Sequence, residues 1–352
     1  MITAQPPLAQ LELAQPRWQQ LWRDAVRDPR ELLAMLGLQS QLADVSDAAA
    51  AQFPLRVPRG FVARMRHGDR EDPLLRQVLP IDAELRVMPG FSLDAVGDLA
   101  ARRETGVIHK YQGRALLVAT GSCAIHCRYC FRRHFDYASD TAASAHWQAA
   151  LDYLRADPTI NEVLLSGGDP LSLSTARLAE FSSALNQISH VRRLRIHTRL
   201  PVVLPERVDS ELLVWLRGLR QQVVVVIHAN HANELDADVG AALHGIHAAG
   251  ATLLNQSVLL RGVNEDLDTQ CALAERLFEL GVLPYYLHQL DRVSGTAHFE
   301  VADDQALELH RQMAARLPGY LLPRLVRECT GAPGKTDLAL TRENLAKLLE
   351  KV

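Results

Sequence analysis

From about residue 108 to residue 290, short apolar runs rich in β-branched residues alternate with longer amphipathic stretches. The runs have the length of strands, and the stretches have helical spacing. Because the runs are almost continuously apolar, we expect a parallel sheet covered by helices. Six such units predict an α/β fold, an incomplete (β/α)6 TIM-like barrel shaped as a crescent. The predicted strands are 115–119, 162–165, 194–197, 223–228, 252–259 and 283–288, and the predicted helices are 144–155, 175–188, 210–219, 238–249 and 267–280.

The chain is predicted to have three parts. Residues 1–107 form an N-terminal helical region, residues 108–290 form the partial barrel, and residues 291–352 form a short C-terminal segment. The first helix is expected to bury one face, with its two tryptophans in the core. That face comprises Trp18, Leu21, Trp22, Ala25 and Val26.

Two further helices are predicted in the N-terminal region from their end signals. Pro29 fits the first turn of a helix that ends near Gly37. Ser92 can cap a third helix, with Asp94 in its first turn.

Composition restricts the class and the compartment. Hydrophobic residues make up 48% of the 352 residues and charged residues 22%, as in a globular enzyme with a large core. The net charge of -3 favours neither nucleic acid nor an anionic membrane as a partner. Residues 1–20 lack the pattern of a signal peptide, and the longest aliphatic run, 223–227, is too short to span a bilayer. We therefore expect a cytoplasmic protein.

Three cysteines follow the first predicted strand at the spacing C-x3-C-x2-C: Cys123, Cys127 and Cys130. Three thiolates can bind three irons of a four-iron, four-sulfur cluster and leave the fourth iron open to a ligand. In barrel enzymes the chemistry lies at the carboxyl ends of the strands, which is where this run is expected. The run resembles the motif of the radical S-adenosylmethionine superfamily.

The alternatives to a cluster are a zinc site and three unrelated buried thiols. Zinc usually takes four ligands, often from paired C-x2-C motifs. The other two cysteines, Cys271 and Cys329, are distant in sequence, and five cysteines of this distribution do not form a disulfide framework. His126 lies inside the run, but the short spacings make a local cage of four ligands cramped.

Glycines and polar residues mark the next strand ends. Gly167 and Gly168 follow the second strand, where glycine lets the backbone approach a ligand closely. After a cysteine run of this kind, we interpret the pair as a contact to S-adenosylmethionine rather than an ordinary turn. His228 and Gln256, at later strand ends, are interpreted as further contacts to this cofactor, and His197 as structural.

Near the C-terminus, Lys335 follows a glycine on a predicted loop. The G-x4-G-K pattern of a phosphate-binding loop is excluded because position 329 is cysteine. A lysine on such a loop can bind the aldehyde of pyridoxal phosphate. By itself, however, the motif favours a surface lysine.

The chain resembles the lysine 2,3-aminomutase family over about residues 105–336. This family combines an open four-iron cluster, S-adenosylmethionine and pyridoxal 5′-phosphate. The matching stretches are 129–133, 165–171, 197–201 and 255–264, together with Asp291, Gly295, His298 and Phe299. The resemblance implies that Lys335 binds pyridoxal phosphate and that Tyr111 and Arg114 contact it.

The resemblance also implies how the substrate is held. Arg132 corresponds to the residue that binds the substrate carboxylate, a task suited to a guanidinium. Asp291 corresponds to an acid that binds the side-chain amine of lysine. Glu328 replaces the family's second amine-binding aspartate, which keeps the charge and adds a methylene group.

The runs 21–26 and 29–33 resemble a shorter bacterial subfamily that makes (R)-β-lysine for modification of elongation factor P. Longer catabolic members continue into a further segment, which we expect this protein to lack. The implied function is an isomerase that converts (S)-α-lysine to (R)-β-lysine, with a functional link to the elongation factor P lysyl ligase. A reductant such as flavodoxin or ferredoxin and a homo-oligomer are also implied.

Three alternatives stay open. The first is a catabolic lysine 2,3-aminomutase, and the second is an aminomutase for another amino acid such as glutamate. Two acids, Asp291 and Glu328, argue against an anionic side chain because like charges repel. The third is a noncatalytic iron–sulfur or zinc protein.

Overall fold

The residues that the structure describes form one open sheet of ten strands. The computed structural model describes residues 15–137, 141–145 and 147–340. The strands lie side by side in chain order, and no pairing closes the two outermost strands onto each other in these ranges. They are β1 (Arg102–Glu104), β2 (Val107–Tyr111), β3 (Arg114–Thr120), β4 (Glu162–Gly167), β5 (Arg193–Thr198), β6 (Gln222–Ile227), β7 (Thr252–Val258), β8 (Leu283–His288), β9 (Arg324–Arg327) and β10 (Thr336–Asp337).

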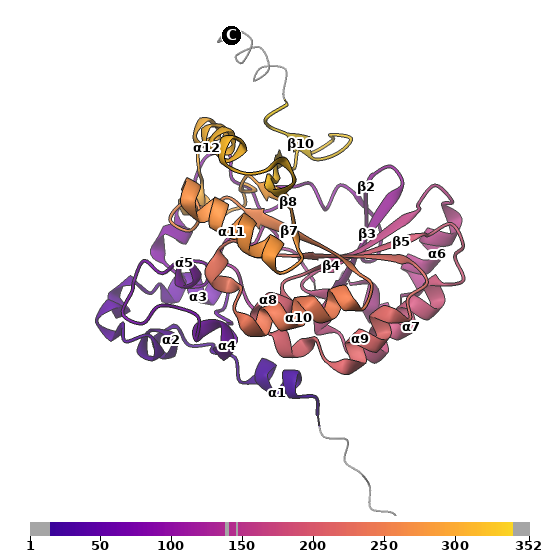
Figure 1. The fold of residues 1–352 in the computed structure, drawn as a ribbon, viewed down its shortest axis with the longest axis horizontal. Coiled ribbons are helices and arrows are strands. Elements are labelled where there is room, and N and C mark those ends of the chain that lie inside the picture. Colours follow the sequence, from indigo (N-terminus) through magenta and orange to yellow (C-terminus); the bar gives the residue numbers. More distant parts are fainter. Residues whose placement is uncertain (1–14, 138–140, 146, 341–352) are drawn as a thin grey trace, which may run out of the picture.

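Strands β3 to β9 pair in parallel, whereas the edges β1–β2–β3 and β9–β10 are antiparallel. One main helix follows each of the six strands β3 to β8, and these helices surround the curved sheet (Figure 1). They are α6 (Gln148–Ala156), α7 (Thr175–Leu185), α9 (Ser210–Arg217), α10 (Ala237–Ala248), α11 (Leu267–Glu279) and α12 (Asp303–Arg316), with the short α8 (Leu200–Val203) before α9. The predicted (β/α)6 crescent is confirmed.

Side-chain caps set where several of these helices begin. Ser174, Asp209, Asp236 and Asp266 each accept a hydrogen bond from a backbone N–H in the first turn of α7, α9, α10 and α11, respectively. Such caps satisfy amide donors that have no partner within the helix. The loops before these four helices therefore end at a defined residue.

The six predicted strands and the five predicted helices are all present, with ends shifted by a few residues. The helix predicted at 144–155 is split, with the short 3₁₀ helix η3 (Ala142–Ala145) before α6, and residue 146 lies outside the described residues. Strands β1, β2, β9 and β10 were not predicted. They have two to five residues each, which is too short for a clear periodic pattern.

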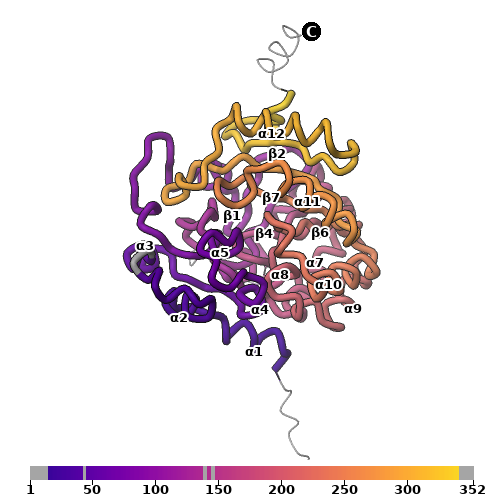
Figure 2. The backbone as a smooth tube through the Cα atoms, turned by 60° about the vertical axis from the view of Figure 1, so that its left-hand side comes forward, coloured from indigo at the N-terminus to yellow at the C-terminus, as the bar shows by residue number. Residues whose placement is uncertain are grey.

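The N-terminal region contains α1 (Arg17–Arg23), α2 (Pro29–Met35), α3 (Asp47–Gln52), α4 (Arg59–Val62) and α5 (Pro73–Arg76). In both views it lies toward the opposite side of the molecule from α12 (Figures 1 and 2). The predicted start of α2 at Pro29 is confirmed, and Gly37 adopts the left-handed conformation just after this helix. Trp18 is buried in the main core, as predicted.

Two details of this region differ from the prediction. Helix α1 ends at Arg23, and Val26 instead exchanges backbone hydrogen bonds with Val57. No helix begins at Ser92, because Ser92 pairs its backbone with Arg292 and Ser294. Asp94 accepts from the amides of Asp98 and Leu99, so it closes a turn of a loop rather than starting a helix.

The N-terminal helices and the barrel share one hydrophobic core. Trp18, Leu32 and Phe61 belong to the same buried cluster as Leu117 and Val163 of the sheet. The division of the chain at residues 107 and 290 stays a prediction. No helix in the described ranges is long and apolar enough to cross a membrane. Most of the stretch used to argue against a signal peptide lies outside the described residues.

A buried carboxylate ties the N-terminal region to the cysteine loop. Glu84, in the 3₁₀ helix η2 (Asp82–Leu85), accepts from Arg128 Nε at 2.8 Å and from Arg133 Nη2 at 2.7 Å. All three side chains are buried. The one negative charge of Glu84 offsets part of the positive charge of the two guanidinium groups inside the protein, where an unpaired charge is costly.

We predict that Glu84→Ala lowers the free energy of unfolding by about 3–5 kcal/mol, because it leaves two buried guanidinium groups unpaired. Chemical denaturation of the purified protein measures this loss. Asp152→Ala is the matched control, since it breaks the exposed pair of Asp152 with Arg155 and is expected to cost less than about 1 kcal/mol. Equal losses in both variants would contradict the prediction.

Candidate active site

Two adjoining cavities, with volumes of about 380 and 320 Å³, lie along the parallel strands. The second lies at the carboxyl ends, and the first extends from there toward the amino ends, where Arg114 and Glu162 line it. Eight residues line both of them, drawn from the loop after β3 and from the ends of β4 to β8. These are Phe131, Arg132, Ser166, His197, His228, Gln256, His288 and Asp291. The parallel strands thus bring residues distant in sequence into one space.

Every residue predicted for the site lines one of these cavities. The first cavity, which is the larger, contains Lys335, Tyr111, Arg114 and Glu328. The second contains Cys123, Cys127, Cys130, Gly167 and Gly168. Arg132, Asp291, His228 and Gln256 lie between the two and line both. His197, interpreted from the sequence as structural, also lines both.

The three clustered cysteines are unpaired and face the second cavity. Burial and the neighbouring Cys127 raise the pKa of Cys130 to about 11, and burial raises that of Cys123 well above its usual value. Bound iron would supply positive charge that stabilises the deprotonated thiolates of these cysteines. In a cluster each thiolate binds a different iron, so the sulfurs need not converge on one point. No group of His, Cys, Asp and Glu in the described part of the chain forms a single-ion site.

Gly167 and Gly168 hold the ends of β3 and β4 together. Gly167 has φ +113°, and a Cβ at Gly168 would lie 2.5 Å from the carbonyl oxygen of Ser122. The amide of Gly168 donates to Thr120 at 2.7 Å. Glycine is therefore required here for the close approach of two backbones, and this packing places the pair beside the cysteines.

Alternating charges line one wall of the first cavity. Glu328 accepts from Lys335 Nζ at 3.1 Å, from Lys110 Nζ at 3.3 Å and from the Tyr111 hydroxyl at 2.5 Å. Lys110 also pairs with Asp98 at 2.7 Å. Burial acts to raise the pKa of Glu328, but Lys335, Tyr111 and Lys110 outweigh it, so this pKa lies below its ordinary value. Glu328 is thus an ionised and fully engaged carboxylate.

Arg132 reaches the same wall from the cysteine loop. Its Nε donates to Asp98 at 2.7 Å and its Nη1 to the Ser166 hydroxyl at 3.0 Å. Its Nη2 has no hydrogen-bond partner among the described residues. The guanidinium is therefore oriented by protein groups and keeps one nitrogen for a ligand.

Asp291 differs from the other acids of the site, because its carboxylate makes no hydrogen bond or ion pair to a described residue. Burial raises its pKa to about 6, and the charge of Lys335 only partly offsets this. A buried carboxylate without a partner is a ready acceptor for a cation.

Three histidines lie between the cavities and are neutral at pH 7. Burial, together with Arg199 and Lys335, lowers the pKa of His228 to about 3. Burial lowers the pKa of His197 and His288 well below 6.5. Among the described residues, the Nε2 atoms of His197 and His288 have no hydrogen-bond partner, and neither has Oε1 of Gln256. Buried polar atoms of this kind indicate space for a polar ligand.

Lys110, Asp98, Ser166, Tyr286 and His288 are site residues that sequence reasoning missed. Tyr286 lies under Lys335, with Nζ 5.7 Å from its ring centre. Tyr286 and His288 are two residues apart on a predicted strand, so they lie on the same face of the sheet. The sequence could therefore have identified them as a pair. Asp98 and Lys110 had no such signal, because they reach the site from a loop and from an unpredicted edge strand.

Together the fold and the site define an enzyme of the radical S-adenosylmethionine class. Its barrel is open, a C-x3-C-x2-C loop follows the first parallel strand, and the other strand ends enclose a polar cavity beside that loop. No family model matches the chain.

Close relatives specify the family. The L-lysine 2,3-aminomutase of Escherichia coli (strain K12) is 45% identical over 92% of this chain and 94% of that protein. That of Haemophilus influenzae is 44% identical over 91% of this chain and 94% of that protein. The L-lysine 2,3-aminomutase of Clostridium subterminale is 32% identical over 90% of this chain and 77% of that protein. The chain belongs to the lysine 2,3-aminomutase family, whose members are isomerases.

Among solved structures, a radical SAM methyltransferase from Sphaerobacter thermophilus is 16% identical, over 65% of this chain and 72% of that chain. The TM-score between the two structures is 0.42, which is too low to support an argument about the fold. The assignment of the fold rests on the strand order of this chain.

We predict that His228 makes stability depend on pH. Its pKa is about 3 when folded and 6.5 ordinarily, so the unfolded chain binds more protons between these values. The contribution of His228 to the free energy of unfolding is complete above about pH 6.5. It is lost as the pH falls toward 3, at about 1.4 kcal/mol per pH unit. In His228→Gln, denaturation curves at pH 6.5 and 5 should show about 2 kcal/mol less loss of stability than in the unaltered protein.

His244→Gln provides the control for this measurement, because His244 is exposed on α10. Its pH dependence should match that of the unaltered protein. A pH slope for His228→Gln equal to that of the control would contradict the assignment of a buried neutral imidazole.

Proposed function

We propose that the protein is a lysine 2,3-aminomutase that converts (S)-α-lysine to (R)-β-lysine. The observation that carries this proposal is the first cavity, in which Lys335, Arg132 and Asp291 surround one space beside the cysteines. A lysine for pyridoxal phosphate, a guanidinium for a carboxylate and a free carboxylate for an ammonium group are the partners that lysine requires.

The cavities offer groups suited to all three cofactors of the family. Cys123, Cys127 and Cys130 would hold the [4Fe-4S] cluster. Gly167, Gly168, His228 and Gln256 would contact S-adenosyl-L-methionine, and Lys335, Tyr111 and Arg114 would hold pyridoxal 5′-phosphate. When bound, the cluster and S-adenosyl-L-methionine supply a radical that takes hydrogen from the substrate, and pyridoxal phosphate carries the migrating amino group.

The chain's own residues would hold the substrate by its two ends. Arg132 would bind the carboxylate through the nitrogen it keeps free, while Asp98 and Ser166 orient it. Asp291 would bind the ε-ammonium group. Glu328 is less available for this task, because Tyr111, Lys110 and Lys335 already engage it.

Lys335 would be the catalytic lysine. Its ammonium pairs with Glu328 at 3.1 Å, so it already points at the wall of the first cavity. Three histidines, the rings of Phe131, Tyr285 and Tyr286, and further charged and aliphatic side chains line the rest of the space.

The polar side chains of the site favour a lysine 2,3-aminomutase over the alternative functions. Two acids, Asp291 and Glu328, line the first cavity and disfavour the anionic side chain of glutamate. A noncatalytic iron–sulfur or zinc protein has no need of the first cavity, which contains Lys335, beside the cysteines. We further propose the link to elongation factor P rather than lysine catabolism, in support of which the runs 21–26 and 29–33 resemble the shorter bacterial subfamily.

The partners and the compartment are proposed on the same basis. The five cysteines are unpaired, which supports a reducing, cytoplasmic location. A reductant such as flavodoxin or ferredoxin, a functional link to the elongation factor P lysyl ligase, and a homo-oligomer follow from the family resemblance. We do not propose a nucleic acid as a partner.

An anaerobic assay tests the function. The protein is incubated with (S)-α-lysine, pyridoxal phosphate, S-adenosylmethionine and dithionite, and the products are separated to measure β-lysine. We predict that Lys335→Ala makes no β-lysine but keeps its iron, whereas Cys127→Ala loses both. Cys271→Ala, which removes a buried cysteine that lines neither cavity, should keep its iron and its turnover. Full turnover by Lys335→Ala would refute the proposal.

We predict that the KM for lysine rises as the pH falls through about 6. The pKa of Asp291 is about 6, so below this pH the carboxylate takes up a proton and loses the charge that binds ammonium. The rise should approach tenfold per pH unit. Asp291→Asn should raise KM at pH 8 roughly 10- to 100-fold, the value of one charge-assisted hydrogen bond, and should abolish the pH dependence.

The matched control for Asp291→Asn is Asp304→Asn, at an exposed acid on α12 that lines neither cavity. It should retain both the KM and its pH dependence. An Asp291→Asn enzyme with an unaltered KM would remove Asp291 from substrate binding.

A further inference from the structure

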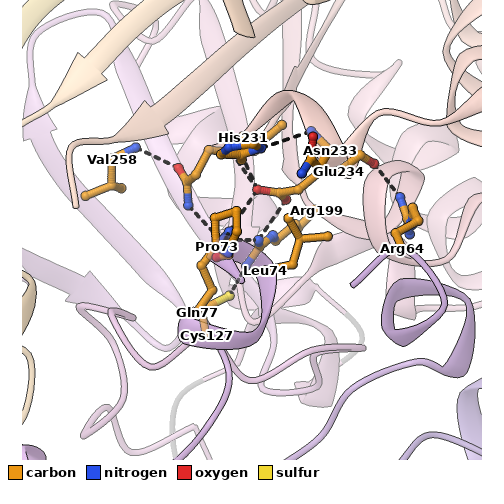
Figure 3. Close-up of polar contacts among 12 residues, drawn as sticks. Arg64, Pro73, Leu74, Gln77, Cys127, Arg199, His231, Asn233, Glu234 and Val258 are labelled. Atoms are coloured by element: carbon orange, nitrogen blue, oxygen red, sulfur yellow. Dashed lines mark hydrogen bonds and ion pairs between the residues drawn. The ribbon is translucent and has the colours of Figure 1, made fainter. Parts of the chain in front are cut away.

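A buried arginine donates a hydrogen bond to one of the three clustered cysteines. Arg199 follows β5, is almost fully buried, and directs Nη1 at Cys127 Sγ from 2.7 Å (Figure 3). Within the described ranges, Cys127 is the one cysteine whose sulfur accepts a hydrogen bond from a charged side chain. The three sulfurs of the loop are therefore not equivalent.

The guanidinium is held in place by protein groups on its other side. Nη2 donates to Glu234 at 2.8 Å and to Gln77 at 2.6 Å, and the backbone amide of Arg199 donates to Asp169 at 2.7 Å. The rings of Phe61 and Tyr129 lie 5.6 and 5.7 Å from its central carbon. These contacts leave the guanidinium little freedom to move away from the sulfur.

Glu234 is itself saturated, which strengthens this clamp. One of its oxygens accepts from the amides of Asn230 and His231 at 2.9 and 3.1 Å and from Gln77 Nε2 at 3.1 Å. The other oxygen accepts from Arg199. Glu234 is fully buried, so its charge stabilises the guanidinium in an interior that would otherwise disfavour it.

Packing alone does not account for this arrangement. Replacing a buried ion pair by apolar residues is often neutral or stabilising, so the pair is weak evidence for a purely structural role. Here one arm of the guanidinium extends beyond the pair to a sulfur on the wall of the second cavity. The three partners Gln77, Cys127 and Glu234 come from an N-terminal loop, the cysteine loop and the loop after β6.

We propose that Arg199 is a positioning residue that favours the reduced form of the cluster by donating to the Cys127 sulfur. The assignment rests on the proposed cluster. Reduction adds one negative charge, and a fixed cation beside a sulfur ligand stabilises that charge. Hydrogen bonds to ligating sulfurs are among the factors that set cluster potentials. Arg199 thereby raises the reduction potential of the site at which S-adenosylmethionine is cleaved.

The test is a redox titration of reconstituted protein, followed by electron paramagnetic resonance of the reduced cluster. The main variant, Arg199→Met with Glu234→Gln, removes both charges together, so that no unpaired charge stays buried. It should bind the same iron as the unaltered protein. Its reduction equilibrium should be about tenfold less favourable, which corresponds to a midpoint about 59 mV more negative for one electron.

Arg207→Met is the matched control, because Arg207 is also fully buried but donates to the carbonyls of Leu171 and Leu173 and lines neither cavity. It should keep the midpoint of the unaltered protein even if its thermal stability falls. A double variant with full iron content and an unshifted midpoint would overturn the role of Arg199.

If the double variant does not retain iron, Arg199→Lys decides the matter. Lysine keeps the charge, but one ammonium group cannot reproduce the fork between Glu234, Gln77 and Cys127. Its midpoint should fall below that of the unaltered protein, and an unshifted value would again overturn the assignment. Absence of iron from the unaltered protein would instead refute the proposed function, so the two failures are distinguishable.

Discussion

Parallel pairing of β3 to β9 is the constraint on which the rest of the structure depends, because it brings the carboxyl ends of these strands to one edge of the sheet. Ser166, His197, Gln256 and His288 each lie at the end of a different strand, yet they line the same two cavities. The glycines at the end of β4 draw that strand against the cysteine loop. The position of the site thus follows from strand direction. The backbone hydrogen bonds that pair the strands place these polar side chains close together.

Burial of charge then decides how the gathered groups behave. Desolvation is the largest influence on the pKa of Glu328, Asp291 and His228, and their partners determine the outcome. Glu328 has three donors and stays ionised, Asp291 has none within the described part of the chain and has a raised pKa, and His228 is neutral. The same logic applies beside the cysteines, where Glu84 pairs with two buried arginines and Glu234 with one. These pairs hold the cysteine loop against the N-terminal region and the barrel.

Much of this organisation was predictable from local patterns, and the failures have physical causes. The six core strands were found because each carries a short group of apolar residues between helical stretches, and the cysteine spacing and Lys335 were visible as motifs. The helix predicted at Ser92 was wrong because a cap residue is also a good turn residue, and here the backbone of Ser92 pairs with the distant Arg292 and Ser294. Lys110 and Asp98 were missed because short edge strands and loops carry no periodic signal.

The amino-acid sequence by itself determined the alternation of strands and helices, the C-x3-C-x2-C loop and the residue types available for chemistry, since these depend on composition and spacing along the chain. Only the tertiary structure decided which charges meet. It showed that Glu328 is engaged by Lys110, Tyr111 and Lys335 while Asp291 is not, and that Arg199 reaches Cys127 across 72 positions of sequence. Electrostatic and hydrogen-bond energies depend on the distance between groups and on their burial, and neither quantity can be read from the order of the residues.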